Sequence, residues 1–209
     1  IGSGVMGSGI ACHFANIGIE VLLLDIAPNK LNDTENKLGL SLDDKKVKNR
    51  IVNEMFQRCI KSKPAPLYHK TFSKRVELGN LTDDLSKIRD VDWIIEVVTE
   101  KLNNKQIVFD QIEKFRSPGT LVTSNTSGIP IKQMNEGRSE DFRKNFAVTH
   151  FFNPPRYLKL FEIIPGPDCN PKIFDFLNDF GERFLGKDFV LAKDTPGFIG
   201  NRIGVMSGI

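Results

Sequence analysis

The strongest constraint on the fold of this chain is the glycine-rich turn with which it begins, Gly2-Ser-Gly4-Val5-Met6-Gly7. Glycines at this spacing let the backbone turn tightly, let a pyrophosphate approach it closely, and let the following helix pack against a sheet. The unpaired N–H groups and the dipole at the N-terminus of that helix favour an anion. The turn needs a strand before it, and we expect Ile1 to be the last residue of that strand. These residues predict a dinucleotide-binding unit.

A carboxylate follows the next predicted strand, which is the apolar segment Glu20-Val-Leu-Leu-Leu-Asp25. An acidic residue about 20 residues beyond the glycines can accept both hydroxyls of an adenosine ribose. A 2′-phosphate would meet the same carboxylate and be repelled. Asp25 therefore predicts NAD rather than NADP. The alternative is an ordinary solvated carboxylate at the end of a strand.

Composition limits the other classes of protein. A chain of 209 residues suffices for one large α/β domain, or for one domain and the start of a second. The longest aliphatic stretch, Val21 to Leu24, is far too short to span a membrane. The net charge of +3 is too small to indicate a nucleic-acid partner. Cys12, Cys59 and Cys169 lack the spacing of disulfides or metal ligands, which favours no metal site and a reducing compartment such as the cytoplasm.

Apolar strand-like runs alternate with helical patterns along the chain, interrupted by one long charged segment over 29–62. This segment predicts a solvated helical insert with one apolar stripe, formed by Val47, Ile51, Met55, Phe56 and Ile60. We expect strands at 91–98, 120–124, 145–150 and 189–192, a less clearly alternating segment at 158–164, and helices at 105–115 and 171–186. The alternation predicts an α/β fold of the Rossmann type, with a doubly wound, mainly parallel sheet.

Several polar side chains fall just beyond predicted strand ends, where the ligands of such sheets bind. Glu100, Asn125, Ser127 and His150 lie at these positions. A histidine suits the removal of a proton from an alcohol, because its unperturbed pKa is ~6.5. Glu162, between apolar neighbours on the next segment, could orient the ring. The alternatives are a structural histidine, a rim carboxylate, and turn-capping roles for Asn125 and Ser127.

Four motifs together resemble, in order, those of the L-3-hydroxyacyl-CoA dehydrogenases. They are Gly2-x-Gly4-x-Met6-Gly7-Ser8-Gly9-Ile10-Ala11, Ser124-Asn-Thr-Ser127, His150-Phe-Phe-Asn-Pro154, and Asp194-Thr-Pro-Gly-Phe198 with Asn201-Arg202. The resemblance spans essentially the whole chain. The segment 156–162, together with the charged insert, is most similar to the dehydrogenase part of large multifunctional β-oxidation proteins that also carry an enoyl-CoA hydratase region.

The resemblance implies NAD-dependent oxidation of L-3-hydroxyacyl-CoA to 3-ketoacyl-CoA in fatty-acid β-oxidation. It implies that His150 is the general base and Glu162 its orienting partner. Ser127 would bind the substrate's 3-oxygen or the nicotinamide side, and Asn201 the substrate carbonyl. The positions that match cofactor-lining residues of the family are Glu100, Lys105, Asn125 and Asn153. One departure is visible, since Gly128 follows Ser127 where many relatives have a second serine.

The resemblance also implies a domain division. Residues 1–193 match the NAD-binding domain, and 194–209 match a linker and the first helix of an all-helical domain that completes the acyl site and often forms homodimers. We therefore expect the chain alone to be inactive or weakly active. The apolar residues of that first helix, expected at the interface, are Ile203, Val205, Met206 and Ile209. The insert matches an arm that contacts coenzyme A, so Lys61 and Lys63 either bind its phosphates or form a solvated helix end.

Two other functions remain compatible with these residues. One is a dehydrogenase of a free hydroxy acid on the same framework. The other is a non-catalytic NAD-binding protein that retains the fold, although the combination of His150, Glu162, Ser127 and Asn201 argues against it.

Overall fold

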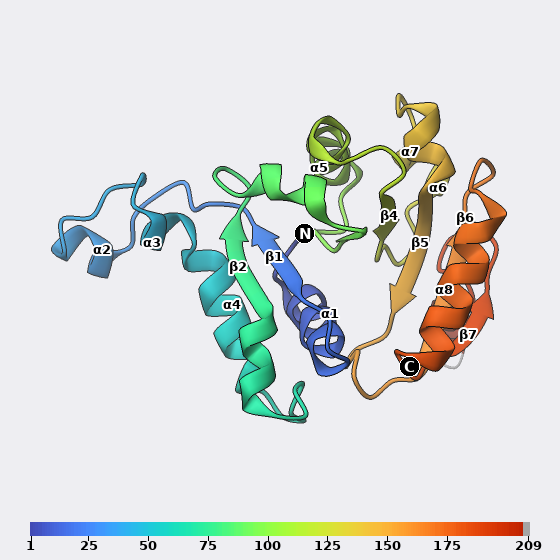
Figure 1. The fold of residues 1–209 in the computed structure, drawn as a ribbon, viewed down its shortest axis with the longest axis horizontal. Coiled ribbons are helices and arrows are strands. Elements are labelled where there is room, and N and C mark those ends of the chain that lie inside the picture. Colours follow the sequence, from blue (N-terminus) through green and yellow to red (C-terminus); the bar gives the residue numbers. More distant parts are fainter. Residues whose placement is uncertain (207–209) are drawn as a thin grey trace.

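The computed structural model describes residues 1–206, in which helices flank two β-sheets that lie edge to edge (Figure 1). The elements are, in chain order, α1 (Val5–Asn16), β1 (Val21–Asp25), α2 (Asp33–Lys37), α3 (Lys45–Lys48), α4 (Arg50–Ile60), η1 (Lys70–Arg75), β2 (Val76–Asn80), η2 (Leu85–Asp90), β3 (Trp93–Glu96), α5 (Leu102–Phe115), β4 (Leu121–Ser124), α6 (Ile131–Met134), α7 (Glu140–Lys144), β5 (Phe146–Phe151), β6 (Leu160–Pro165), α8 (Pro171–Arg183), β7 (Asp188–Leu191) and α9 (Gly200–Met206).

The sheets are mainly parallel, as predicted. One sheet pairs β1 with β2, and the other has the order β3-β4-β5-β6-β7. Two strands of the larger sheet, β6 and β7, run opposite to β3, β4 and β5, because β6 is antiparallel to β5 and β7 is parallel to β6. The reason is the connection between β5 and β6, which is a short loop, whereas a parallel pair needs a crossover of a dozen or more residues.

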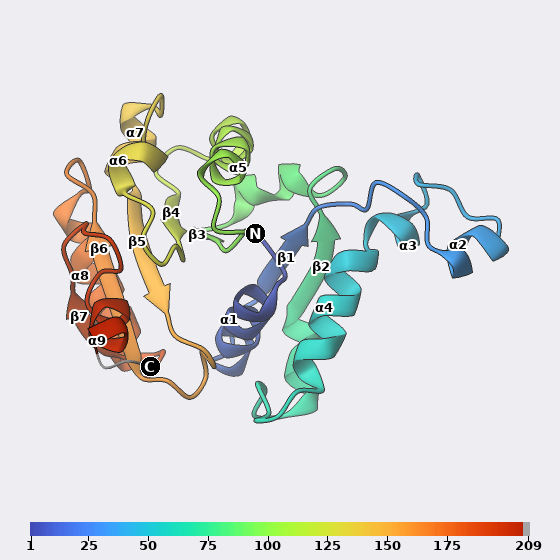
Figure 2. The ribbon, with the colours of Figure 1, turned by 180° about the vertical axis from the view of Figure 1, so that it is seen from behind.

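Ile1 lies between the two sheets, where the N-terminus is marked between β1 and β3 (Figures 1 and 2). Its amino group donates to Ile95 O at 2.7 Å, and its carbonyl accepts from Val97 N at 2.8 Å. On the other side, Gly2 N donates to Leu24 O at 2.7 Å. Ile1 thus occupies a strand position, and the glycine turn emerges at the carboxyl ends of β1 and β3.

Both faces of the larger sheet are buried. Along β5, Phe146 and Val148 pack into the cluster beneath α5, whereas Ala147 and Phe151 pack into the cluster beneath α1 and α8. This alternation follows from the two-residue period of a strand, and it explains why all six residues of β5 are buried. A third cluster joins α1 to α4 and the smaller sheet.

The charged insert is not one long helix, as the sequence pattern had suggested, but the three short helices α2, α3 and α4. Gly39 has a φ of +67° after α2, a conformation that ends a helix at little cost for glycine. Of the predicted stripe, Val47 in α3 and Phe56 in α4 are buried as expected, whereas α4 buries Val52 in place of the predicted Ile51 and Met55. The segment with α2 and α3 extends away from the sheets (Figure 2).

The strand β2 was not predicted, because Glu77 and Gly79 interrupt its apolar pattern. It forms through parallel pairing with β1, from Val21 opposite Val76 to Asp25 opposite Asn80. Tertiary pairing therefore overrides a weak local preference.

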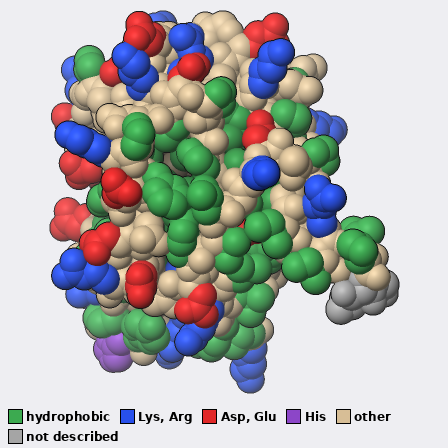
Figure 3. All heavy atoms as spheres, turned by 90° about the vertical axis from the view of Figure 1, so that its right-hand side faces the viewer, with side chains coloured by type: hydrophobic (Ala, Val, Ile, Leu, Met, Phe, Trp, Pro, Cys, Tyr) green, Lys and Arg blue, Asp and Glu red, His purple; other side chains and the backbone are tan. Residues whose placement is uncertain are grey.

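Beyond β7 the chain reaches α9, whose Ile203, Val205 and Met206 are 59%, 78% and 89% exposed. Ile209, expected on the same apolar surface, lies outside the described residues. Seen from the β7 side, hydrophobic side chains gather in the middle of the molecule and continue towards this end of the chain (Figure 3). No helix within residues 1–206 has both the length and the apolar character needed to cross a bilayer.

Candidate active site

The glycine turn is tightly constrained at two positions and open at a third. Gly2 has a φ of +99°, and a Cβ there would lie 2.6 Å from Val97 O. A Cβ at Gly7 would lie 1.8 Å from Gly2 O, whereas a Cβ at Gly4 would meet nothing within 4 Å. No side chain caps the start of α1 at Gly4. The open backbone at Gly4 and the uncapped N–H groups fit a pyrophosphate.

These differences predict distinct outcomes for two alanine substitutions. Gly7→Ala forces the backbone apart and should destabilise the fold by about 1–3 kcal/mol or more. Gly4→Ala should leave the melting temperature nearly unchanged and weaken NADH binding, because its methyl group occupies the space that the pyrophosphate needs. Thermal unfolding and NADH fluorescence titration of both variants test this pair. Equal melting temperatures for the two variants would contradict it.

Asp25 lies at the carboxyl end of β1, where its carboxylate is held in a defined orientation. Its Oδ2 accepts from Ser3 N at 2.6 Å and from the Ser3 hydroxyl, and its Oδ1 accepts from Ile26 N at 2.7 Å. The carboxylate therefore stands beside the glycine turn, as expected for a group that binds a ribose.

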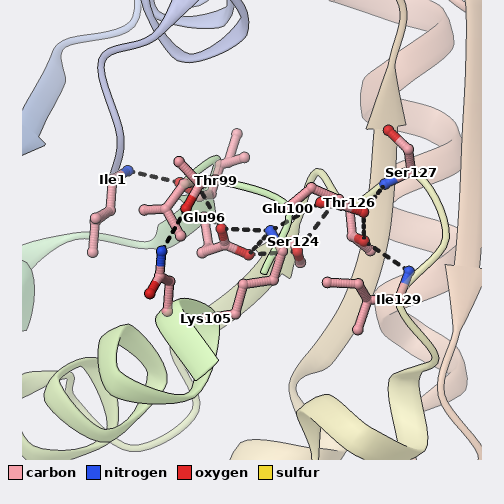
Figure 4. Close-up of polar contacts among 12 residues, drawn as sticks. Ile1, Glu96, Thr99, Glu100, Lys105, Ser124, Thr126, Ser127 and Ile129 are labelled. Carbon is pink, nitrogen blue, oxygen red and sulfur yellow. Dashed lines mark hydrogen bonds and ion pairs between the residues drawn. The ribbon is translucent and has the colours of Figure 1, made fainter. Parts of the chain in front are cut away.

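A buried ion pair lies under the carboxyl ends of β3 and β4 (Figure 4). Lys105 Nζ contacts Glu96 Oε1 at 2.8 Å and Oε2 at 3.0 Å, and the two residues are 1% and 0% exposed. The Ser124 hydroxyl and Val98 N also donate to Glu96. No role was predicted for Glu96 from the sequence, although a carboxylate inside a buried strand requires a partner. Lys105 is occupied by this pair, so its contact with a cofactor stays a prediction.

Two loops meet through Glu100. Its Oε1 accepts from the Thr126 hydroxyl and from Ser127 N at 2.9 Å (Figure 4). Asn125 Oδ1 accepts from Phe151 N at 2.8 Å and so joins the end of β4 to the end of β5. Asn201 Nδ2 donates to Ser127 O at 3.4 Å. The structure therefore brings Ser127 and Asn201 together, although they lie far apart in the sequence.

His150 and Glu162 form a hydrogen-bonded pair at directly opposite positions of β5 and β6. His150 Nδ1 lies 2.7 Å from Glu162 Oε2, and because a carboxylate only accepts, Nδ1 carries the hydrogen. Glu162 Oε1 accepts from Ile199 N at 2.9 Å and Gly200 N at 2.8 Å. Burial would raise the pKa of Glu162, but the hydrogen bonds from His150, Gly200 and Ile199 outweigh it and lower this pKa. The carboxylate is thus charged and fixed, and Nε2 of His150 remains for a substrate.

Aromatic rings hold His150 in place. The ring of Phe152 lies 4.5 Å from the imidazole centroid, and that of Phe198 lies 5.8 Å away. Phe198 has a φ of +45°, which is uncommon outside glycine, and this turn aims the next two N–H groups at Glu162. A Cβ at Gly200 would lie 2.6 Å from the Phe152 ring, so this close approach requires glycine. The contacts of Phe152, Phe198 and both N–H donors with this pair were not predicted from the sequence.

Asn153 lines a cavity of about 200 Å³ together with Gly4 and Val5 of the glycine turn. The loop after β5 therefore faces the predicted pyrophosphate position. Three of the predicted cofactor residues, Asn153, Gly4 and Val5, thus line the same cavity. Asp25 lies at the carboxyl end of β1, beside the glycine turn. Their contacts with a cofactor remain a prediction.

Comparison with known proteins identifies a matching family. The family model described as the 3-hydroxyacyl-CoA dehydrogenase NAD binding domain matches residues 1–195. The chain belongs to this family. A probable 3-hydroxyacyl-CoA dehydrogenase of Bacillus subtilis (strain 168) is 53% identical over 98% of the chain, which covers 26% of that protein. Human mitochondrial hydroxyacyl-coenzyme A dehydrogenase is 34% identical over 97% of the chain, which covers 60% of that enzyme.

The fold of the 3-hydroxyacyl-CoA dehydrogenase NAD-binding domain is also present in solved structures. The structure of 3-hydroxybutyryl-CoA dehydrogenase from Escherichia coli K12 superposes with a TM-score of 0.70 at 30% identity. The match covers 97% of this chain and 39% of that one. The chain thus spans less than two thirds of the length of each of these relatives.

Because this family binds NAD, the role of Asp25 can be tested directly. Asp25→Asn should weaken NADH binding by about tenfold or more, since it removes the charge from hydrogen bonds worth ~1.5–3 kcal/mol. The same change should weaken NADPH binding less, because a 2′-phosphate no longer meets a carboxylate. Fluorescence titration with both cofactors measures the ratio, and Asp175→Asn on exposed α8 is the control. An unchanged NADH-to-NADPH preference would show that Asp25 does not contact the ribose.

Proposed function

We propose that this domain carries the NAD-dependent oxidation of an L-3-hydroxyacyl-CoA to the 3-ketoacyl-CoA in fatty-acid β-oxidation. The single observation that carries the proposal is the His150–Glu162 pair, with Nδ1 occupied and Nε2 available. The family match supports the substrate class, because the relatives are named for 3-hydroxyacyl-CoA or hydroxyacyl-coenzyme A.

In the proposed reaction the glycine turn and Asp25 would hold NAD⁺, which would supply the acceptor for the hydride that leaves C3 of the substrate. His150 Nε2 removes the proton of the 3-hydroxyl group, and the charged Glu162 stabilises the imidazolium that results. General-base catalysis of this kind contributes about 10²–10⁴-fold. Ser127 and Asn201, which lie together, hold the substrate oxygens and thereby orient C3.

The proposal is tested by the oxidation of NADH with acetoacetyl-CoA. Rapid turnover of the thioester, with none of free acetoacetate, is expected. Activity on the free acid alone would identify the enzyme as a hydroxy-acid dehydrogenase. Tight NADH binding without turnover of either compound would identify a non-catalytic NAD-binding protein.

The proposal extends to the partners and the compartment of the protein. It includes a homodimer that uses the apolar surface of α9, supported by the exposed Ile203, Val205 and Met206. It also includes a cytoplasmic location, supported by the three free cysteines. Lys61 and Lys63 are exposed at the end of α4 and are the proposed contacts for coenzyme A phosphates. Light scattering after size-exclusion chromatography, with Met206→Lys as the interface variant, tests the dimer.

A further inference from the structure

Lys187 is a buried cation in the short turn between α8 and β7. Its side chain is 3% exposed, and its Nζ donates to two main-chain carbonyls, Pro155 O and, at 2.7 Å, Leu158 O. Burial alone lowers the pKa of Lys187 to about 8, without a contribution from any carboxylate among residues 1–206. A buried charge without a counter-charge lowers the stability of the fold. The segment that Lys187 Nζ binds therefore indicates what this residue contributes.

Both carbonyl partners belong to residues 152–159, which we call the β5–β6 loop. This loop connects the strands that carry His150 and Glu162. On one side Arg156 donates to Leu67 O at 3.0 Å, and Tyr157 donates to Ala65 O at 2.9 Å. These contacts join the loop to the segment after α4. Lys187 holds the same loop from the turn between α8 and β7.

The β5–β6 loop also packs on the helix that follows the glycine turn. A Cβ at Gly9 would lie 3.0 Å from Pro155 Cδ, so the loop and α1 are already as close as their atoms allow. Pro155 and Asn153 line the cavity of about 200 Å³, and Gly4 and Val5 line it too. Because Lys187 binds the Pro155 carbonyl, it sets how far this loop stands from the glycine turn.

The same α8–β7 turn is bonded to α1. His13 Nε2 donates to Leu185 O at 3.0 Å, two residues before Lys187. Burial, with the nearby charge of Lys187 as the next cause, lowers the pKa of His13 to about 4, so this ring is neutral at neutral pH. The turn therefore holds α1 through His13 and the β5–β6 loop through Lys187, and it fixes the two walls of the cavity relative to each other.

We propose that Lys187 is a positioning residue for the dinucleotide, which holds the β5–β6 loop and its Asn153 at the correct distance from the glycine turn. The proposal rests on NAD binding by this domain and not on the oxidation of an acyl-CoA. Lys187 touches neither the reacting atoms nor the His150–Glu162 pair, so its loss should act on cofactor affinity rather than on the chemical step.

The experiment compares Lys187→Met, Lys187→Arg and the exposed control Lys172→Met by NADH fluorescence titration well below their melting temperatures. Lys187→Met leaves two carbonyls without their donor and should raise the NADH Kd by about tenfold or more, because the β5–β6 loop is no longer held in place. Lys187→Arg keeps the charge and the donors and should restore most of the affinity, while Lys172→Met should match the wild type. In the thioester assay, the KM for NADH should rise in Lys187→Met with kcat nearly unchanged.

A second pair of variants keeps the proposal testable if the methionine variant does not fold. Lys187→Gln retains one amide donor and should show a smaller rise in the NADH Kd. Gly9→Ala places a methyl group 3.0 Å from Pro155 Cδ, displaces the β5–β6 loop, and should also raise the Kd. A Lys187 variant that folds, melts at a lower temperature and still binds NADH with the wild-type Kd would overturn the proposal. Lys187 would then only stabilise the fold. NADH binding by the wild type without turnover would instead count against the proposed reaction and leave this test intact.

Discussion

Replacing His150 with alanine is expected to reduce turnover of the thioester by about 10²–10⁴-fold and to leave NADH affinity nearly unchanged. The variant loses the group that removes the hydroxyl proton, whereas the glycine turn and Asp25 are untouched. His150 is 5% exposed and bonded through Nδ1 to Glu162, so only Nε2 can serve the substrate. The substitution should therefore lower kcat and leave the KM for NADH nearly unchanged.

Steady-state kinetics with acetoacetyl-CoA and NADH measures this effect. His69→Ala is the matched control, because His69 is exposed and its imidazole hydrogen-bonds only to the nearby Thr71 within residues 1–206. The control should retain wild-type turnover. Wild-type turnover in His150→Ala would remove His150 from the mechanism.

Glu162→Gln is expected to have the second largest effect, because it acts on both catalysis and stability. Glu162 accepts from His150 Nδ1, Ile199 N and Gly200 N. A glutamine has one carbonyl oxygen and an NH₂ group, so it cannot accept all three bonds. Bonds to a charged acceptor contribute ~1.5–3 kcal/mol each, so the free energy of unfolding should fall by roughly 3 kcal/mol. Turnover should also fall, by about 10²-fold or more, because the imidazolium loses its counter-charge.

The stability effect should depend on pH in a defined direction. The pKa of Glu162 is lowered in the folded protein, so its carboxylate stabilises the fold above the ordinary glutamate pKa of ~4.3. This contribution is lost as the pH falls through the lowered pKa of the folded state. The difference in unfolding free energy between the wild type and Glu162→Gln should therefore be large at neutral pH and shrink in acid. Urea unfolding at several pH values measures it, with the exposed Glu182→Gln as the control. A difference that grows in acid would contradict this assignment.

The sequence by itself predicted the elements whose signals are local. The glycine turn was predictable because Gly2 needs a positive φ and Gly7 has no room for a side chain. Asp25 was predictable because it follows a short apolar strand at a fixed distance from that turn. The buried strands β3, β4 and β5 were visible as apolar runs, and so was the placement of His150 at the end of one of them. The position of Glu162 on the segment after His150 made it the candidate partner of the ring, and the structure confirms their contact.

Only the tertiary structure decided which distant groups complete the site. The antiparallel direction of β6 places Glu162 opposite His150, and the N–H groups of Ile199 and Gly200 reach Glu162 from beyond β7. Lys187 likewise reaches the β5–β6 loop from another element. None of these contacts leaves a periodic pattern in the sequence, because each depends on one side chain or one N–H group and on the packing of whole elements. Local patterns specify strands and helices, but the partners of buried charges are determined only when those elements pack together.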